Sequence, residues 1–280
     1  MFVFGIPQNG SIRWYLHCGD FRAAPSIIDQ KLTYSEENDS MEKHLQFSDF
    51  LFESVYLDTT YAHPKHSFPP QNRVIAACVD GCRRLLLENY DPAGQKRLVP
   101  LKWLIAVGSY LIGKERIILS IAETFDLLIY ADDRKRAILR LLQWPELEDR
   151  LTDDPLATPL HFVSMSLLSK QKLSDYRESF QGHFSHILGI RPTGWTFGEK
   201  ENDATEEWNL EMPKLDGNSG VWPVPYSEHS SFKELEGFLR VLSVHNVIPT
   251  VDNWSDVVLD SRRVGGDSVA LLHQWARRKK

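Results

Sequence analysis

The chain has 280 residues, of which 42% are hydrophobic and 25% charged, and this globular composition leaves room for one large or two modest domains. Its net charge of −6 excludes a general basic coat, so any contact with nucleic acid must be local. No apolar run approaches the ~18–20 residues of a membrane span, and we expect neither a secretory signal nor a membrane partner. Three cysteines without a C-x-x-C pair favour a reducing compartment.

The N-terminal region is expected to begin with a β-hairpin. Asn9-Gly10 favours a primed two-residue turn between two β-prone runs, which predicts a hairpin over residues 2–17. A β-prone run at 54–57 ends at Asp58, and Pro69-Pro70 opens a helix that continues to about residue 87.

The middle of the chain alternates between strand and helix patterns. The expected strands are 103–107, 127–130, 161–165 and 186–190, and the expected helices are 114–125 and 133–142. This alternation predicts a parallel or mixed sheet covered by helices.

The last third of the chain begins with a polar segment. Residues 198–218 are acidic and nearly aperiodic, which indicates a surface loop or linker. Ser231 and Glu234 fit a capping box that opens an amphipathic helix. A strand at 247–248 stops at Pro249, and a last helix is expected over 268–276.

A glycine-rich turn follows the predicted strand 103–107. From Gly108 the sequence reads G-x-x-x-x-G-K, but Glu115 stands where a nucleotide-binding P-loop needs Ser or Thr to hold magnesium. We therefore expect no nucleotide cofactor. The free N–H groups of a helix start and the charge of Lys114 suit a phosphate of another kind, and a plain tight turn is the alternative.

Basic residues gather at three places, 134–136, 262–263 and 277–280. A solvated face or a frayed tail explains each of them, and a local nucleic-acid contact is the alternative.

In three strand-like stretches the apolar run is followed by a polar residue of a type that binds metal. These residues are His17 in "WYLHCGDFR", Asp58 in "VYLDTTY" and His229 in "VPYSEHSSF". Sheet-based enzymes place metal ligands at such positions, yet each residue taken alone is more often a hydrogen-bonded structural residue.

The stretches "LHCGDFR", "YLDTTY", "GSYLIGKE", "RPTGW" and "PYSEHSS" occur in one order, followed by "IPTV". This series resembles the DNA cross-link repair nucleases, the group that includes Artemis and Apollo. These are enzymes of the metallo-β-lactamase fold that carry a β-CASP insert. The resemblance covers nearly the whole chain, from about Phe2 to the last helix.

The resemblance implies an α/β fold, a metallo-β-lactamase αββα sandwich of two facing mixed sheets that is truncated here. Residues 1–66 and 214–280 would form the metallo-β-lactamase portion. Residues 67–213 would form the inserted α/β β-CASP domain, with 198–218 as its polar loop.

The resemblance also implies roles. His17, Asp58 and His229 would bind metal, with Asp58 bridging two zinc ions, and Asp58 and His229 would belong to the catalytic centre. The chemistry would be 5′ to 3′ exonuclease action on 5′-phosphorylated DNA, in interstrand cross-link or double-strand break repair in the nucleus. DNA-repair proteins are further expected partners. Residues expected to face DNA phosphate are Ser109, Tyr110, Gly113, Lys114, Ser227 and Ser230.

The sequence departs from the family in one respect. The H-x-H-x-D-H signature, which supplies most other metal ligands upstream of the H-x-G-D-F-R stretch, does not occur here. The missing run is expected before Met1, which makes the chain either a fragment of a nuclease or a shortened, non-catalytic module that binds DNA ends or proteins. Retention of His17, Asp58 and His229 favours the fragment. Three ligands shared between two metals are too few, so we expect weak zinc binding and no nuclease activity from this chain alone.

Overall fold

The computed structural model describes residues 1–23, 27, 32–34, 43–66, 68–87, 102–194, 210–213, 215, 217–251, 259–260, 269–270 and 272–274. The chain divides into two compact units. Unit 1 comprises Met1–Phe68, Phe197–Asn202 and Glu228–Lys280, and unit 2 comprises Pro69–Thr196 and Asp203–Ser227. No helix in the described ranges is both long and apolar enough to span a bilayer.

Unit 1 is built on a five-stranded mixed sheet in the order β1-β2-β5-β12-β13. These strands are β1 (Phe2–Gln8), β2 (Ser11–His17), β5 (Leu51–Leu57), β12 (Ser243–Pro249) and β13 (Leu259–Asp260). The three central strands β2, β5 and β12 are parallel, whereas β1 and β13 pair antiparallel with their neighbours. The predicted hairpin is confirmed, and Asn9 and Gly10 have the positive φ angles, 51° and 78°, that a primed turn requires.

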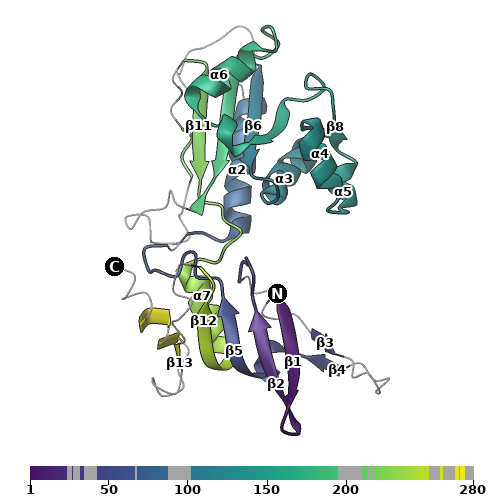
Figure 1. Cartoon of the computed structure of the whole chain (residues 1–280). Helices are drawn as coiled ribbons and strands as arrows, with labels where there is room; N and C mark the ends of the chain where they lie inside the picture. The colour runs from purple at the N-terminus through teal and green to yellow at the C-terminus, as the bar shows by residue number, and fades with distance from the viewer. Residues whose placement is uncertain are drawn as a thin grey trace. The chain divides into compact units, whose positions relative to one another are not determined.

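The helix α7 (Phe232–Val241) covers one face of this sheet (Figure 1). Its predicted capping box is confirmed, because Ser231 accepts from the Glu234 N–H and Glu234 accepts from the Ser231 N–H. Buried apolar residues of α7, among them Leu235 and Phe238, pack in one cluster with Leu16 and Phe52 of the sheet. Short elements complete the unit: β3 (Leu32–Tyr34), β4 (Lys43–Leu45) and the 3-10 helix η1 (Phe47–Asp49).

Unit 2 contains a six-stranded sheet in the order β11-β10-β6-β9-β7-β8, and every neighbouring pair is parallel. Its strands are β6 (Trp103–Ser109), β7 (Ile129–Tyr130), β8 (Leu151–Thr152), β9 (Leu160–Ser164), β10 (His186–Pro192) and β11 (Ser219–Val224). The predicted alternation of strands and helices in this region is confirmed.

Helices cover both faces of the unit 2 sheet (Figure 1). They are α2 (Gln71–Leu86), α3 (Glu115–Phe125), α4 (Asp133–Arg140), α5 (Pro145–Glu148), η2 (Met165–Leu167) and α6 (Lys170–Glu178). Alternate side chains of β6 point to opposite faces, as a strand requires. Ile105 packs in the cluster that contains α2 and α3, whereas Leu104 packs with Leu173 of α6.

Several predictions differ from the structure. The α/β class is confirmed, but the described part of unit 1 contains no second large sheet facing the first. The metallo-β-lactamase portion was predicted to resume at residue 214. In the structure β11 pairs with β10, so that residues 219–224 belong to unit 2 instead. The strands β8, β11 and β13 and the helices α5 and α6 were not predicted. Residues 262–263, 277–280 and most of 198–218 lie outside the described residues, as does part of the helix expected at 268–276.

Candidate metal centre

Two aspartates meet at one edge of the unit 1 sheet. Since β2 and β5 are parallel, their carboxyl ends lie at the same edge. Asp58 directly follows β5. After β2, the Cys18 N–H donates to the Tyr56 carbonyl at 3.0 Å, and Gly19 then turns the chain with φ 61°, so that Asp20 comes beside the end of β5.

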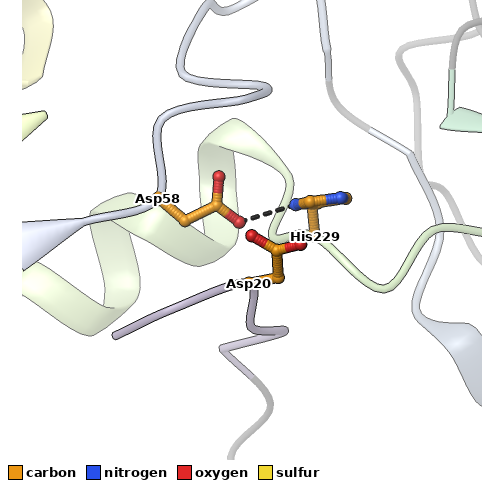
Figure 2. Close-up of side chains that lie close together, drawn as sticks. All are labelled: Asp20, Asp58 and His229. Carbon is orange, nitrogen blue, oxygen red and sulfur yellow. Dashed lines mark hydrogen bonds and ion pairs between the residues drawn. The ribbon is translucent and has the colours of Figure 1, made fainter. Parts of the chain in front are cut away.

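His229 completes the cluster from a third segment. It stands two residues before Ser231, the N-cap of α7. One possible ligand atom from each of Asp20, Asp58 and His229 lies within 4.8 Å of the other two. Figure 2 shows the two carboxylates directed toward each other, with the imidazole ring beside them.

Hydrogen bonds fix Asp58. Its Oδ2 lies 2.7 Å from His229 Nδ1, and its Oδ1 accepts from the Thr60 N–H at 3.0 Å and from the Thr60 hydroxyl at 2.7 Å. Burial raises the pKa of the Asp58 carboxyl, but the bonds from His229 and Thr60 outweigh it and the pKa is lowered overall. Asp58 is therefore an anion near neutral pH, and Nδ1 of His229 carries the proton that it donates.

Asp20 differs from Asp58 in its environment. Its side chain is exposed, and within the described part of the chain no residue donates a hydrogen bond to its carboxylate. Two carboxylates this close repel each other unless a cation lies between them. Carboxylate oxygens and an imidazole are also a donor set that zinc accepts, and three protein ligands with one open position are typical of catalytic zinc sites. The described residues thus fit one metal ion.

A clamp joins the segment of Asp20 to the start of α7. The Ser230 hydroxyl donates to the Phe21 carbonyl and accepts from the Ala23 N–H, both at 2.9 Å. The Arg22 guanidinium Nε lies 2.8 and 2.7 Å from the two carboxylate oxygens of Glu234, the same residue that closes the capping box. These bonds hold Asp20 and His229 in a fixed relation, because each is within two residues of the clamp. The sequence predicted Glu234 as part of the capping box but gave no signal for its pair with Arg22.

The structure brings together two of the three predicted metal ligands, Asp58 and His229, and places Asp20 with them. His17 is not a member of this cluster. The Nδ1 of His17 accepts from the Gly19 N–H at 3.2 Å, and its ring stacks on Tyr56 with 5.5 Å between centroids. The predicted ligand His17 is the last residue of β2, whereas Asp20 lies beyond the turn that follows it, and the role of His17 as a metal ligand stays a prediction. Asp20 could have been considered from its place in "HCGDFR".

The turn between β6 and α3 has the predicted strand–turn–helix form, but one of its backbone N–H groups donates to a side chain of the protein itself. The Gly113 N–H donates to the Glu115 carboxylate at 2.9 Å, so that an internal anion takes the place that we expected for a phosphate. Lys114 has the unusual φ of 77° for a residue with a side chain, and its Nζ lies 5.2 Å from the centre of the Tyr226 ring. Tyr110 is 71% exposed.

The three serines predicted to face phosphate are buried. The Ser109 hydroxyl donates to the Tyr110 carbonyl and accepts from Lys135, and the Ser230 hydroxyl belongs to the clamp in unit 1. The Ser227 carbonyl accepts from Gln71. In this structure Ser109 and Ser230 thus hold backbone segments in place.

The fold and the cluster define an α/β protein with a carboxylate and imidazole cluster, a candidate metal centre, at the edge of a mixed sheet. Residues 145–255 match the family described as DNA repair metallo-beta-lactamase. The chain is 33% identical over 296 residues to the DNA cross-link repair protein pso2/snm1 of Schizosaccharomyces pombe, covering 100% of this chain and 48% of that protein. It is 35% identical over 264 residues to the DNA cross-link repair protein SNM1 of Arabidopsis thaliana, covering 94% of this chain and 48% of that protein.

A more distant relative carries an activity in its name. The 5′ exonuclease Apollo of Danio rerio is 24% identical over 253 residues, which cover 90% of this chain and 34% of that protein. The chain belongs to the DNA repair metallo-β-lactamase family. It spans about half the length of the two DNA cross-link repair relatives from fission yeast and Arabidopsis.

Proposed function

We propose that the chain is the metal-binding and DNA-binding region of a nuclear DNA repair nuclease. The reaction is zinc-dependent hydrolysis of phosphodiester bonds, from a 5′ phosphate in the 5′ to 3′ direction, during repair of interstrand cross-links or broken ends. The observation that carries this proposal is the meeting of Asp20, Asp58 and His229 within 4.8 Å in a chain whose relatives are named for cross-link repair and 5′ exonuclease activity.

In this proposal the side chains of Asp20, Asp58 and His229 together hold the zinc ion. When bound, zinc supplies a Lewis acid for a phosphoryl oxygen and lowers the pKa of a water molecule. The protein's own part is positioning. Thr60 and His229 fix both oxygens of Asp58, and the clamp through Arg22 and Ser230 fixes the segment that carries Asp20. Such supporting bonds commonly change metal affinity by about 10–100-fold.

The donor count limits what this chain does alone. Three donors suit one ion, whereas a two-metal phosphodiester mechanism needs ligands for both ions. The sequence has no H-x-H-x-D-H run that would add them. We therefore expect zinc to bind weakly and nuclease activity to be below detection.

In unit 2, Lys114 and Tyr110 are the proposed phosphate contacts. Lys114 supplies a positive charge at the start of α3, and the exposed Tyr110 supplies a hydroxyl from the loop that precedes it. Gly113 shapes the turn with φ 99°. Lys114→Ala is expected to weaken binding of 5′-phosphorylated DNA.

Zinc binding tests the metal centre. Titration calorimetry should give about one zinc per chain at saturation, with weak affinity, and Asp20→Asn and Asp58→Asn should each reduce that affinity at least about tenfold. Glu53→Gln is the matched control, because it removes a carboxylate of the same unit that pairs with Arg13 outside the cluster. If the unaltered chain binds no zinc even at saturating concentrations yet binds DNA, a non-catalytic DNA-binding module replaces the nuclease.

Digestion of 5′-phosphorylated single-stranded DNA tests the expected inactivity. The unaltered chain with added zinc should release no nucleotides. Robust degradation that is lost on Asp58→Ala would show that these three donors suffice for catalysis, and the proposed need for further ligands would then be wrong.

A further inference from the structure

A crevice is expected where two neighbouring strands of the unit 2 sheet send the chain in opposite directions. From β6 the chain passes through α3 to β7, beyond β9, whereas from β9 it passes through α6 to β10, beyond β6. The helices α3 and α6 pack on opposite faces of the sheet. In open parallel sheets, ligands bind outside the carboxyl ends of the strands at such a switch point.

The structure has a cavity of about 610 Å³ at this place. The loop after β6, the first turns of α4 and the end of β9 line it, with Tyr110, Leu111, Arg134, Lys135, Phe162 and Ser164 among the lining residues. Its size lies within the range of pockets for small ligands, roughly 300–1,000 Å³, and is ample for a nucleotide.

Lys135 holds one wall of the cavity. Its side chain is buried, although the sequence favoured a solvated face for residues 134–136. The ammonium group donates to the Ser109 hydroxyl at 2.7 Å, the Tyr110 carbonyl at 2.8 Å and the Leu111 carbonyl at 2.9 Å. It also lies 4.4 Å from the centre of the Phe162 ring. All three of its donors are therefore used to fix the backbone of the loop.

The side chains of this fixed loop point into solvent. Tyr110, Leu111 and Ile112 are 71%, 58% and 62% exposed. A run of three exposed apolar side chains is unfavourable for a folded protein, and such a run therefore indicates a function. A pinned backbone also lowers the entropy lost when such side chains contact a ligand. The loop leads directly into Gly113 and Lys114, the turn proposed to contact phosphate.

We propose that this cavity takes one unstacked base of a DNA strand, with Tyr110 as its stacking platform and the exposed Arg134 beside the neighbouring phosphate. The inference rests on the proposed function, because it assumes that DNA is the ligand. An exposed aromatic ring, an apolar hollow and a cation at its rim are the features with which proteins bind single-stranded nucleic acid. An apolar peptide would use the hollow but would gain nothing from the Arg134 guanidinium that lines it.

The test compares two strands of equal charge. One is a 5′-phosphorylated thymidine oligonucleotide, and the other is the same sugar–phosphate strand without bases. Fluorescence anisotropy should show tighter binding of the strand with bases. Tyr110→Ala should weaken the strand with bases roughly 5- to 100-fold more than it weakens the abasic strand, which loses only the phosphate contact of the Tyr110 hydroxyl, and Tyr110→Trp should restore the difference. Lys114→Ala should weaken both strands.

The outcomes separate the two proposals. If both strands bind equally and Lys114→Ala weakens both, DNA binding stands and the base pocket is overturned, which leaves an apolar protein segment as its occupant. If neither strand binds, the base pocket and the DNA-binding part of the proposed function fail together.

A second measurement does not depend on the folding of any variant. A 5′-phosphorylated strand carrying 5-iodouracil is irradiated with the unaltered chain, and the adduct is mapped by mass spectrometry. Adducts on the peptide that contains residues 110–112 are expected. Adducts confined to other segments would overturn the base pocket. Ile138→Trp, which fills the cavity from α4, should abolish the adduct at residues 110–112 in protein shown to be folded.

Discussion

Arg22 contributes more to the stability of unit 1 than an exposed surface arginine would. Its side chain is 6% exposed and its Nε lies 2.7 Å from Glu234, whose side chain is 23% exposed. Its guanidinium also lies 4.9 Å from the centre of the Phe68 ring. Removing one partner of such a pair leaves a desolvated charge without compensation.

We predict that Arg22→Ala lowers the free energy of unfolding by roughly 2–4 kcal/mol, measured by urea denaturation. Arg22→Lys should recover only part of this, because an ammonium does not reproduce the planar guanidinium fork. Arg13→Ala is the control. Its pair with Glu53 has side chains 44% and 29% exposed, and its loss should cost about 1 kcal/mol or less. Equal losses at Arg13 and Arg22 would contradict the clamp.

His161 lies in the core of unit 2 as a neutral imidazole. Its Nε2 donates to the Pro155 carbonyl and its Nδ1 lies within hydrogen-bond distance of the Tyr176 hydroxyl, both at 2.9 Å. Burial lowers the pKa of His161 to about 4, whereas an imidazole in an unfolded chain titrates near 6.5. Between these values the unfolded chain binds the proton and the folded chain does not, so that stability falls as the pH falls.

We predict a loss of about 1.4 kcal/mol per pH unit from His161 between about pH 6.5 and 4. Urea denaturation of the unaltered chain and of His161→Gln over this range measures it, because only the difference in slope belongs to His161. The variant should be less stable near neutral pH and should lose less on acidification. Parallel curves would show that His161 is already protonated in the folded chain.

At the scale of elements, a glycine inside helix α2 marks a close approach. A Cβ atom built on Gly81 would come within 2.3 Å of the Trp222 ring of β11, and within 2.9 Å of the Met212 sulfur. Gly237 in helix α7 has no atom within 4 Å of the same added Cβ. Both glycines lie inside helices, where alanine is intrinsically favoured by about 1 kcal/mol.

The same substitution should therefore have opposite effects at the two positions. Gly81→Ala is expected to destabilise the chain by about 1–3 kcal/mol through overpacking against Trp222. Gly237→Ala is expected to stabilise it by about 0.4–1 kcal/mol. Melting temperatures of the two variants, measured side by side, provide the test. Stabilisation by Gly81→Ala would mean that α2 and β11 are not packed as described.

Elements with local signals were predictable, and elements defined by distant partners were not. The hairpin at Asn9-Gly10 and the capping box at Ser231 follow from neighbouring residues alone. Strand β11 was missed because Pro223 and Gly220 argue against a strand, and the structure places it at the sheet edge, where proline is tolerated. In the sequence Lys135 belongs to a run of basic residues, which favours a solvated face. Its burial could not be predicted, because only the tertiary fold brings three acceptors to its ammonium group.

The candidate metal centre illustrates the same limit. A resemblance in sequence pointed to the stretches around residues 17–22, 58 and 229, and the structure brings these together. Which side chain of the first stretch faces the others depends on the turn at Gly19, which no pattern in the sequence specifies. The sequence therefore named His17 and did not name Asp20.

At the scale of the whole chain, the two units have separate cores, and Asp20, Asp58 and His229 all belong to unit 1. A ligand that binds only the folded form stabilises the unit that holds it by RT ln(1 + [L]/Kd), about 2.7 kcal/mol at a concentration of 100 Kd. Zinc should therefore stabilise unit 1 and leave unit 2 unchanged, because no described donor cluster of this kind lies in unit 2.

Amide hydrogen exchange followed by mass spectrometry resolves this difference along the chain. With zinc, we predict slower exchange in β2, β5 and α7, and unchanged exchange in β6 and β10. Asp20→Asn should shift the effect of zinc to at least about tenfold higher zinc concentration, while the exchange of the zinc-free chain stays the same. Slower exchange in both units, or a zinc dependence that Asp20→Asn does not change, would place the metal elsewhere than the edge of the unit 1 sheet.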